Sequence, residues 1–425
     1  MKTHVKVAAA AVAAAGLLTA AGCGSSSPAG SGSVSGSGGG VVKLSVLTGF
    51  TGPDGPSYQA LVSQFNASHP TIKVTMDIQP WDAIGQKLPA EWATGQGPDL
   101  ATPNFDPGVI FNYIKTNSVL PLDSSVGAAD SQINASAFPP AVTKAFTVNG
   151  HLYAVPANLA TVALYYNKTM FTAAGITDPP KTSEEFVADV KKLTLGGASP
   201  TQYGISLADH QTIEMWPILQ WMNGGDIVGP DGCATIDSAA SVQALSTWAG
   251  MVQNQHVSPV GQTGADADTL FSAKKAAMEL NGPWAADGFR KAGIDLGIAP
   301  VPAGSSGPVT LASTVPMMVA KNTKHKEQAL EFLSWWTGKT AQASFSKGSG
   351  YPPARSDVTV SDPNVAVFAQ GLPTARLYLA GLPTSSQIDT DIYTPLLGQL
   401  TRGADAQKSA DAAAKSINQL TGCKS

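Results

Sequence analysis

Aromatic residues stand beside polar residues at several places in the chain. A pyranose ring has an apolar C–H face and a rim of hydroxyl groups, so its binding site needs a flat ring for stacking and carboxylates or amides for hydrogen bonds. A tryptophan can equally serve as a core residue, because its burial is strongly favourable. The clusters that favour saccharide chemistry are Trp81-Asp82, Asn104-Phe105-Asp106, residues 211–216, residues 281–284 and residues 389–393.

The sequence lacks common motifs of nucleophilic, metal and nucleotide chemistry. It contains no G-x-S-x-G, no H-E-x-x-H and no G-x-G-x-x-G. Gly338-Lys339-Thr340 matches the end of a phosphate-binding loop, but Leu333 stands where the first glycine is required. None of the 6 histidines is paired at a metal-ligand spacing. We therefore expect no catalytic residue, no metal and no cofactor.

Two adjacent tyrosines offer one alternative to this expectation. Tyr165 and Tyr166 could ligate ferric ion, because phenolate oxygens are used for this purpose in some iron-binding proteins. They follow the apolar run Val162-Ala163-Leu164, which is typical of a buried strand. The strand is the favoured interpretation.

The composition excludes several classes of protein. A chain of 425 residues is too long for one hydrophobic core, so at least two domains are expected. The chain contains 26 Lys and Arg residues and 30 Asp and Glu residues, which gives a net charge of −4. This charge argues against a nucleic-acid partner. The 3 cysteines include no C-x-x-C pair, which argues against zinc-ribbon and thioredoxin-type sites.

The N-terminal segment is typical of a secretory signal peptide. Lys2, His4 and Lys6 precede an apolar run over residues 7–21, which is too short to span a bilayer as a helix. The run ends in Leu18-Thr19-Ala20-Ala21-Gly22-Cys23, which resembles the lipobox of bacterial lipoproteins, with Cys23 as the lipid attachment residue. The alternative is an ordinary signal peptide in which the cysteine is coincidental.

The next segment suits a tether. Residues 23–40 are mostly Ser and Gly, with no side chains able to offset the entropy of ordering, and residues 25–40 should reach roughly 20 Å as a coil. No later apolar run is long enough to cross a membrane. We therefore expect an extracytoplasmic protein that is lipid-anchored to the outer face of the cell membrane.

The body of the chain begins with an alternation of strand and helix. Apolar residues recur at period two over 42–46, at helical spacing over 58–65 and again at period two over 72–78. A crossover helix between two strands predicts a parallel pair and an α/β fold. Thr182 with Glu185 predicts a capping box at a helix start, and residues 324–336 predict a helix with one apolar face.

Five further segments resemble one family in its own order. Together they look like the extracellular solute-binding proteins of ABC sugar importers, of the maltodextrin-binding type, over residues from about 41 to the C-terminus. The segments are Gly97-Pro98-Asp99-Leu100; Tyr153-Ala154-Val155-Pro156 with Leu164-Tyr165-Tyr166-Asn167-Lys168; Pro179-Pro180-Lys181-Thr182 with Glu185; Lys275-Ala276-Ala277-Met278 with Gly282-Pro283-Trp284; and Gly350-Tyr351-Pro352-Pro353-Ala354-Arg355.

The resemblance implies an architecture. It predicts a two-lobed, periplasmic-binding-protein-like α/β fold with a hinge and discontinuous lobes. The N-terminal lobe would contain residues 41–156 and 303–336, and the C-terminal lobe residues 157–302 and 337–425. The ligand would lie between the lobes.

The resemblance also implies substrate-binding residues. Trp284 matches the tryptophan that stacks on a sugar ring, and Asp391 and Tyr393 replace an aromatic pair near the C-terminus, which favours a shorter or different saccharide. The remaining candidates are polar or aromatic residues near the hinge and in the segments that supply contacts: Asp106, Asn104, Trp81, Asn158, Gln211, Glu214 and Trp216.

The two cysteines other than Cys23 form an even pair. In an oxidising compartment Cys233 and Cys423 could form a disulfide, since the resemblance places both in the second lobe. Two isolated buried thiols are the alternative.

The sequence leaves three functions open. The first is a non-enzymatic receptor, expected to be monomeric, that captures a mono- or oligosaccharide and delivers it to an ABC permease. The second is a receptor of the same fold for another polar solute, such as a glycerophosphodiester. The third is a secreted lipoprotein hydrolase, which the missing nucleophile motif weakens.

Overall fold

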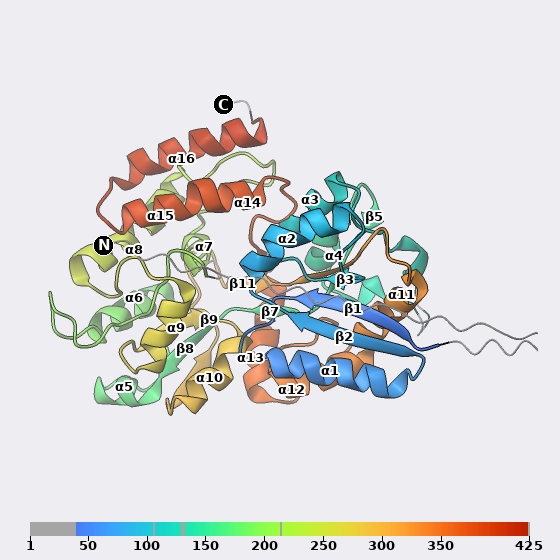
Figure 1. Cartoon of the computed structure of the whole chain (residues 1–425). Helices are drawn as coiled ribbons and strands as arrows, with labels where there is room; N and C mark the ends of the chain where they lie inside the picture. The colour runs from blue at the N-terminus through green and yellow to red at the C-terminus, as the bar shows by residue number, and fades with distance from the viewer. Residues whose placement is uncertain (1–39, 105–106, 128, 130–131, 213–214, 424–425) are drawn as a thin grey trace, which may run out of the picture. The chain divides into compact units, whose positions relative to one another are not determined.

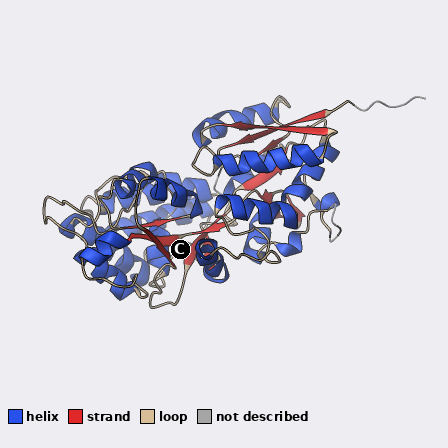
Figure 2. Cartoon of the chain, turned by 90° about the horizontal axis from the view of Figure 1, so that it is seen from below, coloured by secondary structure: helices blue, strands red, loops and turns tan. Residues whose placement is uncertain are grey.

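The computed structural model describes residues 40–104, 107–127, 129, 132–212 and 215–423. Val41–Ser425 forms one compact unit, in which strands lie inside a covering of helices (Figure 2). Cys23, Asp106 and Glu214 lie outside the described residues. Among the described helices, none is both long and apolar enough to cross a membrane.

The first core is built on a five-stranded sheet in the order β2-β1-β3-β12-β6. Strand β1 is parallel to β2 in the register Val42↔Ile72 and also parallel to β3, whereas β12 is antiparallel to β3 and β6. Helix α1 connects β1 to β2 and packs beside them (Figure 1). The predicted strand, helix and parallel strand are confirmed. The strands are β1 (Val42–Thr48), β2 (Ile72–Ile78), β3 (Leu100–Ala101), β12 (Pro316–Val319) and β6 (Val155–Pro156).

Helices cover this sheet with apolar faces. The predicted helix over 324–336 is α11 (Lys326–Trp336), which buries Ala329, Phe332, Leu333 and Trp336. The other elements that belong with the first core are α1 (Gly55–Ser68), α2 (Trp81–Ala93), α3 (Ile110–Lys115), α4 (Pro140–Phe146), α12 (Lys339–Ser349), the hairpin β4 (Thr147–Val148) and β5 (His151–Leu152), and the short helices η1 (Pro107–Val109), η2 (Asp123–Ser125) and η3 (Ala135–Ala137).

The second core surrounds an antiparallel sheet in the order β10-β8-β9. Helix α6 starts with the predicted capping box, in which Thr182 Oγ1 accepts from the Glu185 amide at 3.2 Å and the Glu185 carboxylate accepts from the Thr182 amide at 3.3 Å. Tyr165 lies in β8 and is fully buried, as the strand interpretation predicted. The strands are β8 (Ala163–Asn167), β9 (Met278–Asn281) and β10 (Leu296–Ala299).

The helices of the second core include the C-terminal pair α15 and α16, which pack on each other (Figure 1). These elements are α5 (Lys168–Ala173), α6 (Ser183–Lys192), α7 (Met215–Trp221), α8 (Ala239–Gln255), α9 (Gly264–Ser272), η4 (Pro283–Ala285), α10 (Ala286–Lys291), α13 (Pro363–Gly371), α14 (Ser385–Gln387), the π-helical segment η6 (Ile388–Tyr393), α15 (Thr394–Leu400) and α16 (Ala406–Thr421). We include in the second core the smaller adjoining cluster that contains Tyr165, Phe289 and Phe368. The short helix η5 (Leu372–Thr374) follows α13, and its Leu372 packs against the first core.

The chain passes between the two cores at a small sheet of strands β7 (Ala160–Thr161), β11 (Thr310–Ser313) and β13 (Ala375–Leu377). Ala160 belongs to the first core and Val162 to the second, so the chain leaves the first core between these two residues. It returns to the first core after Leu311. The last passage lies after Ala354. The crossings therefore differ from the predicted boundaries at 156/157, 302/303 and 336/337.

Packing and hydrogen bonds explain this difference. The Phe345 ring of α12 lies 4.8 Å from the Tyr58 ring of α1, and Arg355 donates to the Thr337 carbonyl at 2.9 Å. Residues 337–354 thus remain with the first core, not with the C-terminal lobe. Ala303, in turn, is hydrogen-bonded to Lys181 and Ser183 beside α6, which keeps it in the second core.

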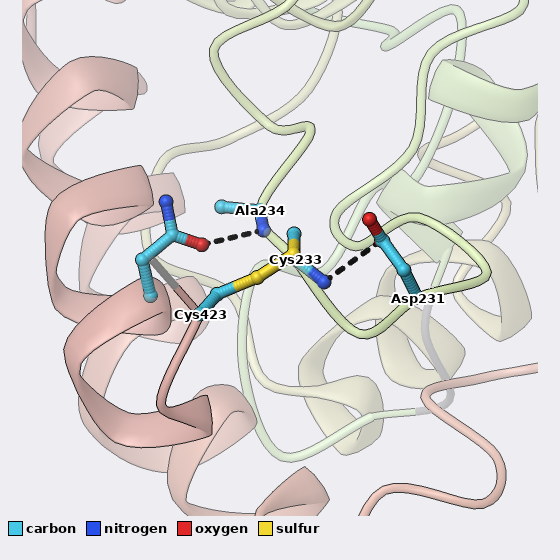
Figure 3. Close-up of a disulfide and its surroundings, with 5 residues drawn as sticks. Asp231, Cys233, Ala234 and Cys423 are labelled. Carbon is cyan, nitrogen blue, oxygen red and sulfur yellow. Dashed lines mark hydrogen bonds between the residues drawn. A yellow bond between two sulfur atoms is a disulfide. The ribbon is translucent and has the colours of Figure 1, made fainter. Parts of the chain in front are cut away.

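A disulfide joins Cys233 to Cys423, whose Cα atoms are 5.5 Å apart (Figure 3). The Ala234 amide donates to Asn418 Oδ1 in α16 at 2.8 Å, and the Cys233 amide donates to Asp231 Oδ1 at 3.1 Å. The bond and these contacts tie the end of α16 to the loop that precedes α8.

Candidate functional site

A cavity of about 320 Å³ is lined by residues of both cores, and its volume falls within the usual range for small-molecule sites. The lining combines aromatic rings, two carboxylates, side-chain amides and exposed backbone. These residues are Gly49, Phe50, Thr51, Gly52, Asp54, Trp81, Asn158, Gln211, Thr212, Gly264, Ala265, Asp268, Asn281, Trp284, Ser313, Val315 and Tyr351.

Aromatic rings reach the cavity from both cores. Trp81, the first residue of α2, packs edge-on against Phe50 with ring centroids 5.6 Å apart, and Phe50 stacks on buried Tyr58 at 3.6 Å. Trp284 lies in η4 of the second core and meets the Tyr351 ring at 6.2 Å. Both tryptophans are partly exposed, so apolar ring surface is available to a ligand.

A glycine lies under each tryptophan. A Cβ atom on Gly49 would stand 2.0 Å from the Trp81 ring, and one on Gly282 would stand 2.1 Å from the Trp284 ring. A real Cβ cannot approach so closely. The two rings can therefore occupy their positions only because residues 49 and 282 lack a side chain.

Of the two carboxylates that line the cavity, Asp54 is the one that the first core contributes. Tyr351 Oη donates to Asp54 Oδ2 at 2.8 Å. Partial burial raises the pKa of Asp54, and the hydrogen bond from Tyr351 opposes this increase. Since Tyr351 is buried, it holds the carboxylate in place from behind.

Asn158 is fixed at the passage between the cores. Its Nδ2 donates to Tyr58 Oη at 2.6 Å, its Oδ1 accepts from the Val315 amide at 3.1 Å, and its carbonyl accepts from Thr314 Oγ1 at 2.8 Å. These bonds join the two chain segments that leave the first core. Asn158 therefore has a structural role there in addition to its place in the cavity wall.

Asp268 and Asn281 line the cavity from the second core and are hydrogen-bonded to each other. Asn281 Nδ2 donates to Asp268 Oδ1 at 2.7 Å and to Glu279 Oε1 at 2.7 Å, while Asn281 Oδ1 accepts from the Gly282 amide at 2.8 Å. Burial raises the pKa of Asp268, although hydrogen bonds from its neighbours lower it in part. The network connects the carboxylate to the backbone that carries Trp284.

The charge of the lining is negative. The described lining residues include two carboxylates and no Lys, Arg or His. Within the described ranges, no group of three or more His, Cys, Asp or Glu residues could hold a metal ion. The site is therefore suited to a ligand that offers hydrogen-bond donors and apolar faces.

The structure brings four of the predicted residues to this cavity, namely Trp81, Asn158, Gln211 and Trp284. Asn104 does not line it. Of the four, Gln211 is the most exposed and has a left-handed backbone conformation with φ of 48°.

The other predicted residues lie elsewhere. Trp216 is 2% exposed in the second core and donates from Nε1 to the Ala208 carbonyl at 3.1 Å. Tyr393 is also buried and donates to Gln220 Oε1, whereas Asp391 is exposed and accepts from Thr390. Trp216 and Tyr393 line a separate, smaller cavity of about 80 Å³ that shares Gln211 and Thr212 with the first.

Several lining residues were not predicted from the sequence. Asp54 and Asp268 have no sequence context that marks them, since turns and helix surfaces commonly carry aspartate, and Phe50 has the type of a core residue. Tyr351 stands within the motif at 350–355, so the motif could have pointed to it.

The comparison with protein families decides the class. Residues 51–343, more than half of the chain, match the model of the bacterial extracellular solute-binding proteins. The chain belongs to this family. Its members are binding proteins, so the hydrolase alternative is excluded, and the family is an extracytoplasmic one.

Individual relatives agree with this assignment. The maltotriose-binding protein of Pyrococcus abyssi is 25% identical over 327 residues, which cover 72% of this chain and 65% of the relative. A Listeria monocytogenes ABC substrate-binding protein in complex with cycloalternan has a TM-score of 0.78 at 23% identity, covering 90% of this chain and 100% of that one. UgpB from Mycobacterium tuberculosis, in complex with glycerophosphocholine, has a TM-score of 0.76 at 20% identity, covering 88% and 97%. The predicted two-lobed fold is confirmed.

Proposed function

We propose that the protein captures a mono- or oligosaccharide in this cavity and delivers it to the membrane permease of an ABC importer. The observation that carries the proposal is the placement of Trp81 and Trp284, from different cores, around a lining that also contains Asp54 and Asp268. Aromatic rings suit the C–H faces of a sugar, and carboxylates accept hydrogen bonds from its hydroxyls.

A glycerophosphodiester is the second candidate ligand, because one structural neighbour binds glycerophosphocholine. A phosphate group prefers Arg, Lys or several backbone amides, and two carboxylates would repel it. Since the described lining contains Asp54 and Asp268 without a cationic side chain, the saccharide is the better match.

A thermal-shift and calorimetric panel tests this choice. It would contain mono-, di- and trisaccharides, including maltotriose, together with glycerophosphocholine as the phosphodiester probe. A bound ligand at a hundred times its Kd stabilises the folded state by ~2.7 kcal/mol. Stabilisation by a sugar supports the proposal, whereas stabilisation by glycerophosphocholine alone would replace it with the second candidate.

We further propose that the mature protein begins at a lipid-modified Cys23 and is held at the outer face of the membrane by residues 23–40. The lipobox-like sequence and the Ser/Gly-rich segment support this proposal. In cells, wild-type protein should enter the detergent phase on phase partition, and Cys23→Ala should remain aqueous. Equal aqueous partition of both proteins would contradict the anchor.

A further inference from the structure

Glu279 is a buried acid that stands behind the cavity and does not line it. It lies in β9, between Met278 and Leu280 of the core, and is 0% exposed. Asn281 Nδ2 donates to its Oε1 at 2.7 Å, but its Oε2 is buried and accepts no hydrogen bond from any described residue. A carboxylate in this position would carry an uncompensated charge, which is costly away from water.

The neighbours on adjoining elements do not supply the missing donor. Tyr165 is paired with Glu279 across β8 and β9, but its hydroxyl donates to the Gly282 carbonyl at 2.6 Å. Ser206 is bridged to Glu279, but its hydroxyl donates to the Ala267 carbonyl at 3.0 Å.

The charged groups nearby are mainly acidic. On α10, Arg290 is paired with Asp287 at 3.3 Å, with both side chains substantially exposed. Asp268 on α9 shares the Asn281 amide with Glu279. Two carboxyl groups therefore converge on one amide donor. Of the two cations on α10, Arg290 is engaged with a carboxylate of its own helix and Lys291 is exposed at the end of the helix.

We propose that Glu279 is a neutral carboxylic acid whose Oε2–H group donates a hydrogen bond to the Asp268 carboxylate and so positions that carboxylate toward the ligand. In this arrangement Oε1 accepts from Asn281, and the proton on Oε2 makes the otherwise missing hydrogen bond. Glu279 is thus a positioning residue for the binding site. This inference rests on the proposed function only in taking Asp268 as a ligand contact.

Electrostatics decides which of the two acids holds the proton. Two carboxylates in contact cannot both ionise easily, so one proton is retained by the pair. Burial raises the pKa of Glu279 well above its usual range, and the negative charge of Asp268 raises it further. Asp268 is partly exposed to the cavity, so the charge is better solvated there and the proton belongs to Glu279.

The arrangement has a defined pH dependence. An acid whose pKa is raised in the folded state holds a proton that the unfolded chain has released, so folding stability falls as pH rises from the unfolded pKa of about 4.3 toward the folded pKa. Ionisation also removes the hydrogen bond to Asp268 and places a second charge beside it. Ligand affinity should therefore fall at pH values around and above the folded pKa of Glu279, where the carboxyl group of the folded protein ionises.

The substitution Glu279→Gln tests the proton directly. Glutamine keeps an acceptor for Asn281 and provides a permanent N–H donor for Asp268, so it imitates the protonated acid at every pH. Glu279→Leu removes both functions at similar volume. Glu327→Gln makes the same chemical change at an exposed position of α11 and serves as the matched control.

Infrared spectroscopy and pH profiles provide the measurements. At neutral pH the wild-type protein and the Glu327→Gln control should show the carbonyl band of a protonated carboxyl group, and Glu279→Gln should lack it. Thermal unfolding from pH 5 to pH 9 should show an alkaline loss of stability in wild type that Glu279→Gln largely abolishes. With maltotriose as the probe, wild-type affinity should fall at least about tenfold over the pH range in which the protonated carboxyl band disappears, and Glu279→Gln should retain its affinity within about threefold over that range.

The outcomes separate this inference from the proposed function. An unchanged carboxyl band in Glu279→Gln, or a pH profile that still parallels wild type, would overturn the inference. A positioning role is supported if folded Glu279→Leu binds maltotriose weakly at all pH values and Glu279→Gln restores the affinity. If wild type does not bind maltotriose at any pH, the sugar proposal fails for that probe, while the carboxyl band and the stability profile still decide the state of Glu279.

Discussion

Replacement of Trp284 with alanine should affect ligand binding and folding to different degrees. The ring is partly exposed, lines the cavity, and packs at the margin of both cores beside Tyr351. A purely structural tryptophan would show its effect in unfolding, and a stacking residue would show it in binding. The position of Trp284 predicts a measurable effect in both, with the binding effect specific to the ligand.

The magnitudes follow from the surface that each process buries. Truncation of a fully buried tryptophan costs ~3–5 kcal/mol, so a partly exposed ring should cost less, about 1–3 kcal/mol. If a sugar covers about 55 Å² of the indole, the lost apolar contact at ~25 cal/mol/Å² is about 1.4 kcal/mol. This corresponds to a tenfold weaker affinity.

Calorimetric titration and chemical denaturation of the same samples measure the two quantities. Trp284→Phe retains a stacking ring and should bind within a few-fold of wild type. Trp216→Phe changes a buried ring outside this cavity and serves as a control that should affect stability alone. Wild-type affinity in Trp284→Ala together with a loss of ~3–5 kcal/mol of stability would contradict this prediction, because the residue would then be a core residue.

Two further predictions concern backbone and covalent constraints. Gly282→Ala should displace the Trp284 ring and weaken sugar binding about tenfold in calorimetric titrations. Gly85→Ala in α2 is the control and should leave the affinity unchanged, because a Cβ at this position meets open space. Equal affinity of the two variants would mean that the position of the Trp284 ring is unimportant. Cys233→Ser breaks a bond between residues 190 apart and should lower the free energy of unfolding by about 2–5 kcal/mol in denaturant titrations, with little change in affinity. Reduction of the wild-type bond should reproduce this loss, and an unchanged denaturation midpoint in both samples would contradict it.

Features set by neighbouring residues could be predicted from the sequence. The alternation over 42–46 and 72–78 indicated strands, because period-two burial is a local property of an extended chain. Thr182 and Glu185 indicated a helix start, because a capping box closes within four residues. The family resemblance added Trp284, which the structure places in the cavity lining.

Features that depend on long-range packing could not be predicted in this way. Residues 337–354 were expected in the second lobe, but the apolar face of α12 packs on α1, almost 300 residues earlier in the chain. The family resemblance predicted Trp216, together with Gln211 and Glu214, as a ligand contact. Trp216 is instead buried, because elements from several parts of the chain surround α7. Neither placement is encoded in the local spacing of residues.

The sequence by itself determined the α/β class, the helix and strand starts and the types of residue available for sugar chemistry, because each depends on local periodicity, hydrogen bonding or composition. Only the tertiary structure decided which residues meet at the cavity. Asp54 and Tyr351 are distant in sequence, as are Trp81 and Trp284, and they converge because the chain passes between two cores three times. The convergence of Asp268 and Glu279 on the Asn281 amide similarly requires α9 to pack beside β9. Burial, and with it the charge state of these acids, is a property of the assembled fold.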